Sequence, residues 1–212
     1  MREHLWPSSQ SLGLSLPGTV SVPVEQDDAL LVAASKNGDQ DAFSLLVLRY
    51  QRRVFNLVFR MLQNYEEACE ITQETFLAAW QGLPAFRGDA RFTTWLYRIA
   101  YNCSLKQLDA RKRDQALQVA LQSEQEDEEL QSTQLTRLDD QELVQEQLSQ
   151  LPPKYRIVLI LRHLQDMTYE EMAEVLTMPI GTIKTHLFRA RNLLKERLQS
   201  FGYGRKQKET RG

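Results

Sequence analysis

Residues 86–102, FRGDARFTTWLYRIAYN, place five large aromatic side chains among three arginines. Large aromatic side chains are usually buried, whereas arginines are usually exposed. At about 100° per residue, the pattern predicts a helix that starts near residue 92 and runs to about residue 113. Its buried face would carry Phe92, Leu96, Ile99 and Cys103.

A second stripe of the same helix lies about a quarter-turn from the first and carries Trp95, Arg98 and Asn102. An aromatic plane, a cation and an amide are the groups that proteins use to stack on unpaired bases, neutralise the backbone and read a base edge. The loop 86–91, flexible at Gly88 and cationic on both sides of it, could form the wall of a pocket for a flipped base. The alternative is that Trp95 and the tyrosines simply pack against neighbouring helices.

The residues before this stretch predict further helices. Apolar side chains recur at three- and four-residue steps after Gly38-Asp39, which predicts an amphipathic helix to about residue 61. Asn64 and Glu67 form a capping pair for the next helix, which Gly82 and Pro84 end. A shorter helix is expected over residues 27–36.

The middle of the chain has a different composition. Residues 115–147 are rich in glutamine and acidic side chains and contain no aromatic residue, so this segment buries too little apolar surface to fold alone. We interpret it as a flexible acidic linker, with a helix near residues 138–148. The expected organisation is a disordered tail (1–24), a helical domain (25–114), the linker (115–147), a second helical domain (148–200) and a basic tail (201–212).

The second domain carries the pattern of a helix-turn-helix. Leu151-Pro152-Pro153 opens a helix that ends near His163, and Thr168 and Glu171 form a capping box for a short helix that breaks before Pro179. A last helix follows over residues 180–199. Two short helices joined by a tight turn are typical of proteins that place the second helix in the DNA major groove.

The last helix has one apolar stripe and one cationic face. Its core stripe is Ile183, Leu187, Ala190 and Leu194. The opposite face combines cations for phosphates with polar groups for base edges, and Phe188 on it could contact a thymine methyl group. The candidate DNA-contacting residues are Lys184, Thr185, His186, Phe188, Arg189, Arg191 and Lys195. A surface helix whose Phe188 packs against a neighbour is the alternative.

Composition excludes several classes of protein. No apolar run approaches the ~20 residues of a membrane span, and the N-terminal residues lack the apolar core of a signal peptide. The two cysteines, Cys69 and Cys103, have no metal-site spacing and suit a reducing cytosol. The net charge is only −2, but basic residues gather at 86–113 and from 180 onward, which predicts two contacts with a polyanion.

Several motifs resemble those of a known family. AFSLLVLRYQRRVFNL, EITQETFLAAW and FRGDARFTTWLYRIAYN, within residues 41–114, are similar to region 2 of bacterial sigma factors of the extracytoplasmic-function (group IV) type. Residues 151–198, with LPPKYRIVLILRHLQDMTYEEMAEVL and PIGTIKTHLFRARNLLKERL, resemble region 4. No full region 3 intervenes. One departure is Cys69, where the family often has an acidic residue.

The resemblance implies an all-α protein with two helical domains that directs core RNA polymerase to promoters. It implies that region 4 reads the minus-thirty-five element and that region 2 melts the minus-ten element, using Phe86, Arg87, Arg91, Phe92, Trp95, Arg98 and Asn102. The helices that would face the clamp of RNA polymerase contribute Tyr50, Arg53, Asn56, Arg60, Ile71, Gln73, Glu74 and Phe76. It implies no cofactor or metal, a linker that threads polymerase near the RNA path, and an anti-sigma factor as a further partner.

Two other readings remain open from the residues alone. A helix-turn-helix regulator that binds duplex DNA unaided explains the second domain but not the Trp95, Arg98 and Asn102 stripe. A carboxylate-bridged metal enzyme could use Glu66, Glu67, Glu70 and Glu74, but such sites use Glu-x-x-His pairs, and neither His163 nor His186 follows a glutamate by three residues.

Overall fold

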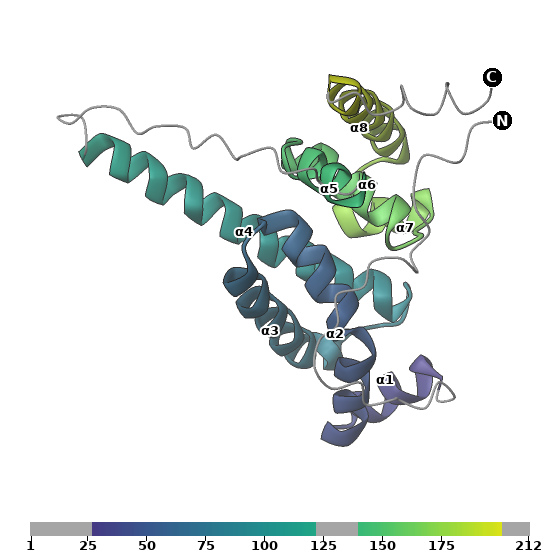
Figure 1. Ribbon diagram of the computed structural model, residues 1–212. Helices are drawn as coiled ribbons and strands as arrows, with labels where there is room; N and C mark the ends of the chain where they lie inside the picture. Colours follow the sequence, from purple (N-terminus) through teal and green to yellow (C-terminus); the bar gives the residue numbers. More distant parts are fainter. Residues whose placement is uncertain (1–26, 122–139, 201–212) are drawn as a thin grey trace.

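The computed structural model describes residues 27–121 and 140–200, and every regular element within these two ranges is a helix (Figure 1). The first range holds α1 (Asp28–Lys36), α2 (Gln40–Leu62), α3 (Tyr65–Gly82), the 3-10 turn η1 (Leu83–Ala85) and α4 (Phe92–Leu121). The second range holds α5 (Asp140–Ser149), α6 (Pro153–His163), α7 (Tyr169–Leu176) and α8 (Ile180–Ser200). The prediction of an all-α protein with two helical domains is confirmed. The predicted tails, 1–24 and 201–212, lie outside the described residues.

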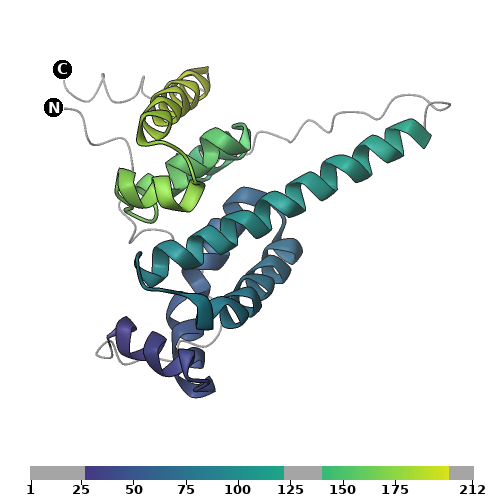
Figure 2. The same cartoon turned by 180° about the vertical axis from the view of Figure 1, so that it is seen from behind.

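The N-terminal domain is built around α2, which packs against α1, α3 and α4. Figure 2 shows α4 crossing the face of this bundle. Leu46, Leu57 and Met61 of α2 and Leu96 of α4 are fully buried at the centre of the domain. Because burial of such a side chain contributes ~1.5–3 kcal/mol, the apolar stripe of α2 makes a large contribution to the stability of this domain.

The helix-start signals in the sequence act as predicted. Asp39 caps α2, and the Asn64 side chain accepts a hydrogen bond from the Glu67 amide at 3.0 Å. Glu67 does not return a bond to the cap, because its carboxylate pairs with Arg111 of α4. Thr168 and Glu171 form a reciprocal capping box at the start of α7.

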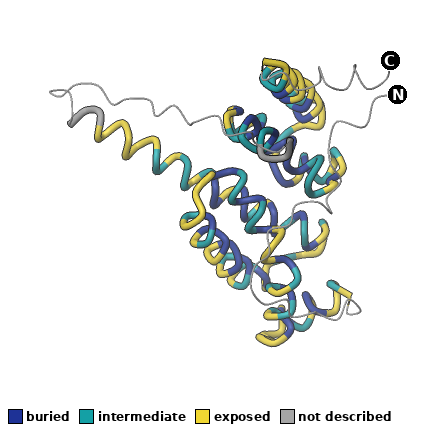
Figure 3. Tube along the Cα trace, viewed as in Figure 1, coloured by how far each residue is buried: buried dark blue, intermediate teal, exposed yellow. Residues whose placement is uncertain are grey.

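The helix expected to end near residue 113 continues to Leu121. The added turns include Leu117, which is 61% exposed and therefore gains little from packing. Ala, Leu and Gln make up most of this stretch and all favour helix, so intrinsic propensity accounts for the extension. Figure 3 shows α4 extending from the bundle, with mostly exposed residues up to residue 118.

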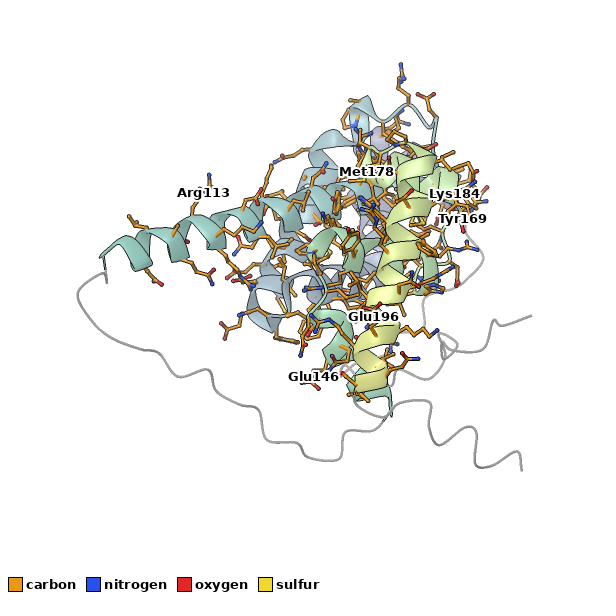
Figure 4. All side chains as sticks on the ribbon, turned by 90° about the horizontal axis from the view of Figure 1, so that it is seen from above. Arg113, Glu146, Tyr169, Met178, Lys184 and Glu196 are labelled. Atoms are coloured by element: carbon orange, nitrogen blue, oxygen red, sulfur yellow. The ribbon has the colours of Figure 1, made fainter. Side chains whose placement is uncertain are left out.

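The C-terminal domain begins earlier than its predicted start at residue 148. α5 covers much of the predicted helix at 138–148, and Val144, Gln147 and Leu148 on it are buried. Since α5 packs against α8, residues that we assigned to the end of the linker belong to the folded domain. The four helices enclose Leu151, Leu159, Met172 and Leu187, and α8 lies along the outer side (Figure 4).

The two domains are in contact with each other. α7 packs on α4, and α6 packs on the end of α2. Arg156 of α6 is 8% exposed and donates to the carbonyl oxygens of Met61 in α2 at 2.8 Å and of Leu151 in its own domain at 3.0 Å. The sequence did not predict this association.

Candidate nucleic-acid interfaces

The loop before α4 is tied to the N-terminal domain at its start. Lys36 Nζ donates to the carbonyl oxygen of Phe86 at 2.7 Å. Gly88 has a φ of 82°, a conformation that other residues rarely adopt, and allows the sharp turn between the two arginines of the loop. Arg87 pairs with Asp89 at 2.7 Å, but both side chains are largely exposed, so the pair contributes little stability.

Trp95 lies partly inside and partly outside the core. Its ring centroid is 4.8 Å from that of Phe86 and 5.8 Å from that of Phe92. Gly82 makes room for the indole, because a Cβ at that position would approach Trp95 to 3.2 Å. The ring is thus held in a fixed orientation while remaining half-buried. Phe92 itself is buried and also packs against Tyr50.

The remaining aromatic and basic residues of the stretch separate by face. Tyr97 and Tyr101 are buried, whereas Arg98 and Asn102 are exposed beside Trp95. Burial raises the pKa of the Tyr97 hydroxyl to about 12, although the nearby Arg53 opposes the shift. The two tyrosines therefore belong to the core. The predicted second stripe is present and consists of the half-buried ring of Trp95 and the exposed side chains of Arg98 and Asn102.

Two clefts flank the loop. One, of about 690 Å³, is lined by aromatic rings, cations and carboxylates, which include Phe86, Phe92, Arg53, Arg91, Asp28 and Glu171. The other, of about 300 Å³, is lined by Thr94, Trp95 and Arg98 on α4 and by Ala173 and Glu174 on α7. Both clefts contain residues of the C-terminal domain in their walls.

The second candidate interface is the outer face of α8. Lys184, Thr185, Phe188, Arg189, Arg191 and Lys195 are all exposed, whereas Ile183, Leu187, Ala190 and Leu194 are buried. Phe188 is 67% exposed and so does not pack against a neighbour as the alternative reading required. Figure 4 shows Lys184 beside Tyr169, and its Nζ lies 5.6 Å from the centre of that ring.

Three of the predicted reading residues on α8 also make contacts within the protein. Thr185 Oγ1 donates to the carbonyl of Gly181 at 2.9 Å, which leaves the hydroxyl oxygen able to accept. Arg191 lies 3.3 Å from the ring nitrogen of His163. His186 packs edge-on against Tyr155, and its pKa is lowered by burial and then by Lys154 and Arg189.

The predicted polymerase-facing residues fall into two groups. Arg53, Gln73 and Glu74 are exposed and Asn56 and Arg60 are partly exposed, so these five can contact a partner. The side chains of Tyr50, Ile71 and Phe76 are buried, and Tyr50 donates a hydrogen bond to Asp28 of α1. This corrects their place in the predicted surface, because their apolar faces are needed to pack α2 and α3 in the core.

Sequence reasoning missed the residues that join the domains. Gln165 accepts a hydrogen bond from the Tyr97 hydroxyl at 2.7 Å, and Glu171 pairs with Arg91 at 3.2 Å. Arg156 offered a weak signal, since it is a charged residue within an apolar helix. A single sequence does not say which carbonyl oxygens such a side chain would reach.

Neither a cluster of metal-ligating side chains nor a membrane-spanning helix occurs among the described residues. Across residues 27–121 and 140–200, no three His, Cys, Asp or Glu side chains gather as a metal site would require. Within the same ranges, no helix is both long and apolar enough to cross a membrane.

Family models and known proteins match both domains. A model described as "Sigma-70 region 2" matches residues 46–114, and one described as "Sigma-70, region 4" matches residues 141–194. The RNA polymerase sigma-H factor of Pseudomonas aeruginosa is 35% identical in an alignment of 192 positions that covers 82% of this chain and 95% of that protein. The ECF RNA polymerase sigma factor SigW of Bacillus subtilis is 33% identical in an alignment of 173 positions that covers 77% of this chain and 92% of SigW.

A solved structure is similar over most of the chain. The sigma factor RpoE of Bartonella quintana, in complex with the anti-sigma factor NepR, superposes with a TM-score of 0.59 at 26% identity, over 74% of this chain and 96% of that one. Because both regions match in order and relatives above 30% identity span most of the chain, the protein belongs to the extracytoplasmic-function group of the sigma-70 family of RNA polymerase sigma factors.

Proposed function

We propose that this sigma factor divides promoter recognition between its domains, so that α8 reads the minus-thirty-five duplex and α4 holds the melted minus-ten strand. As a member of the sigma-70 family, the chain directs promoter-specific transcription initiation and is an initiation factor, not an enzyme. The division of roles between named residues is the part that goes beyond the family assignment.

The observation that carries the proposal is the exposed strip on α4. Trp95 is held by Phe86 and Phe92, so its ring is oriented before a base arrives. Arg98 and Asn102 follow it and are exposed. Stacking on such a ring contributes ~1–3 kcal/mol per base, and an oriented ring loses little conformational entropy on binding.

The loop 86–91 supplies the site for a flipped base. The larger cleft beside it is lined by Phe86, Arg91 and Phe92, and the Lys36 bond to Phe86 fixes the wall of this cleft. A base extruded from the duplex needs stacking surface on its faces and polar groups at its edge. Phe86 and Phe92 in the lining of the cleft would supply the stacking surface, and Arg91 with the carboxylates of Asp28 and Glu171 would supply the polar groups.

The face of α8 fits the major groove of duplex DNA. Arg189 and Lys195 would contact phosphates or base edges, and the exposed ring of Phe188 would contact a thymine methyl group. His186 is held edge-on against Tyr155 and would position the first turns of α8 rather than carry charge.

Core RNA polymerase would contact the exposed residues of α2 and α3. Arg53, Asn56 and Arg60 on α2 and Gln73 and Glu74 on α3 are available for this contact. The side chains of Tyr50, Ile71 and Phe76 are buried, and they would support the polymerase contact indirectly by holding α2 and α3 in position. The similar RpoE structure contains an anti-sigma factor, and we propose a protein of that class as a further partner of this chain.

The proposal is tested by comparing the chain alone with the chain bound to core polymerase. Melting costs a few kcal/mol per unstacked base, and each base contact contributes only ~1–3 kcal/mol, so the isolated chain should bind promoter duplex weakly and open none of it. Permanganate footprinting should reveal reactive thymines only when core polymerase is present. Opening by the chain alone would contradict the proposal, and tight specific duplex binding without core would favour an ordinary helix-turn-helix regulator.

A further inference from the structure

We propose that His163, the last residue of α6, is a positioning residue for promoter recognition, because its imidazole holds Arg191 of α8 ready to contact a DNA phosphate. The inference rests on the proposed role of α8 as the helix that reads the minus-thirty-five duplex, and it gives a role to a histidine outside that helix. Three observations support it: the place of Arg191 on α8, the contact between the two side chains, and the charge state of the imidazole.

Arg191 lies at the edge of the exposed face of α8 and not at its centre. Successive residues of a helix are about 100° apart, so Arg191 is about 40° around the helix from the buried Leu187 and about 60° from the exposed Phe188. When a helix lies in the major groove, the centre of its exposed face points at base edges, and its flanks are closest to the phosphates. Arg191 therefore suits a phosphate contact, whereas Phe188 suits a base contact.

The last residue of α6 reaches this edge of α8. The Nη2 atom of Arg191 lies 3.3 Å from Nε2 of His163, whose side chain is half-buried. Since arginine has donors only, the ring nitrogen of His163 is the acceptor of this hydrogen bond. The neighbouring cation of α6 has other partners, because Arg162 donates to the Met167 carbonyl at 2.9 Å and lies over the ring of Tyr169.

The imidazole of His163 is in the charge state that this hydrogen bond requires. Burial, followed by Arg191 and Arg162, lowers the pKa of His163, and Asp166 opposes the shift. The ring is therefore neutral at pH 7, with one donor nitrogen and one acceptor nitrogen. The bond from Arg191 makes Nε2 the acceptor and so assigns the proton to Nδ1.

A guanidinium that is already held should bind a phosphate more tightly than a mobile one. An arginine side chain has many rotamers, and fixing it in a complex costs conformational entropy. The bond to His163 restricts Arg191 before DNA arrives. Arginine has five N–H donors, and the imidazole nitrogen accepts from one of them, so the guanidinium can still donate to a phosphate. His163 therefore raises duplex affinity without contacting DNA itself.

The test measures how tightly the full chain, assembled with core polymerase, binds a labelled promoter duplex at a temperature low enough to keep the strands paired. The promoter is one mapped from transcripts that rise when the chain is overexpressed, and fluorescence anisotropy gives the affinity. His163→Ala is placed in the parent chain, in Arg191→Ala and in Lys195→Ala. Lys195→Ala is the matched background, because Lys195 is another exposed cation of α8, one turn beyond Arg191.

His163→Ala should weaken duplex binding by about three- to ten-fold, the effect expected when one long side chain has to be ordered on binding. It should weaken the Lys195→Ala background by the same factor but leave Arg191→Ala unchanged, because the positioned group is already absent. His163→Gln should keep most of the affinity, since its side-chain oxygen can accept from Arg191. His163→Leu fills a similar volume without an acceptor and should behave as His163→Ala does.

The outcomes separate this inference from the proposed function. An equal loss from His163→Ala in all three backgrounds would overturn the inference, because His163 would then support the domain as a whole. If Arg191→Ala weakens binding but His163→Ala and His163→Leu do not, α8 keeps its role and only the positioning by His163 is wrong. If neither Arg191→Ala nor Lys195→Ala weakens binding, the proposed role of α8 is wrong and the inference fails with it.

Discussion

Phe188 and Lys195 lie on the same exposed face of α8 but should contact different parts of a DNA duplex. Lys195→Ala removes a phosphate contact, so it should weaken binding similarly for all sequences and lower the salt dependence of binding. Phe188→Ala removes an apolar contact to a base and should change which bases are preferred, by ~1–3 kcal/mol at the position concerned. Selection of bound sequences by each variant holoenzyme, followed by salt titrations, checks both outcomes. A changed base preference in Lys195→Ala would contradict this orientation of α8.

The histidines of the C-terminal domain should make stability depend on pH. Burial, followed by neighbouring arginines, lowers the pKa of His163, and burial, followed by Lys154 and Arg189, lowers the pKa of His186. Because the pKa of each histidine is lower in the folded state, the unfolded chain binds more protons at a pH near or below the ordinary histidine pKa of about 6.5. Stability therefore falls as the pH decreases through this range. Chemical denaturation at pH 7.5 and 5.5 should show this loss, and H163Q/H186Q should reduce it. An equal loss in the double variant would assign the effect to other groups.

Individual residues mark the limit of what the sequence predicts. The stripe of Trp95, Arg98 and Asn102 was predicted from its spacing, and the residues do share a face. The same spacing did not show that Phe86 and Gly82 would hold the Trp95 ring, because these contacts come from the turn before α4. Tyr50, Ile71 and Phe76 were predicted on a surface but are buried. The resemblance to the family identifies which helices face polymerase, but it does not say which side of each helix is exposed.

At the scale of the elements, the capping box of α7 should matter more than its short length suggests. Thr168→Ala removes the acceptor for the Glu171 amide and should destabilise the chain by ~1 kcal/mol. Ser44→Ala, at an exposed position within α2, is the matched control and should be close to neutral. Thermal unfolding measures both changes. A Thr168→Ala melting temperature equal to that of the control would show that packing alone fixes the start of α7.

Helix starts were predicted better than helix ends. Asp39, Asn64 and Thr168 begin helices as expected, because their side chains satisfy backbone amides that are local in sequence. The end of α4 was misplaced, because no capping residue or proline marks it and helix-favouring residues continue to Leu121. The apolar residues of α5 were too few to separate a packed helix from a linker until α8 was seen to cover them.

At the scale of the whole molecule, the acidic linker offers a prediction about initiation. Glu124, Asp127, Glu128 and Glu129 lie outside the described residues, and their role is inferred from the sequence. If their charge acts inside polymerase, replacing all four with glutamine should alter the lengths of abortive transcripts. Duplex binding by the C-terminal domain should not change, because its contacts lie on α8. Identical abortive products from the two chains would reduce the linker to a tether.

The association of the domains could not be predicted from the sequence. Arg91 contacts Glu171 and Tyr97 contacts Gln165, and both partners are far away in the chain. No motif in the sequence predicts either contact. Only the three-dimensional arrangement shows that α7 packs on α4, next to the residues that we propose for strand binding. Both domains were recognisable one by one because each carries its own local patterns.

If Arg98 and Asn102 of α4 hold the melted minus-ten strand, their removal should impair formation of the open complex. The template is a promoter mapped from transcripts that rise when the chain is overexpressed, used as intact duplex and as duplex already unpaired across the minus-ten element. R98A/N102A removes two exposed side chains that together should contribute ~2–6 kcal/mol to strand binding, with Q51A as the matched control.

With core polymerase, R98A/N102A should lower open-complex formation on duplex by at least about ten-fold, while core binding and melting temperature stay unchanged. The unpaired template should restore only part of this loss, because strand separation is supplied but base reading is still missing. Open complexes formed by R98A/N102A as readily as by Q51A on intact duplex would contradict the account.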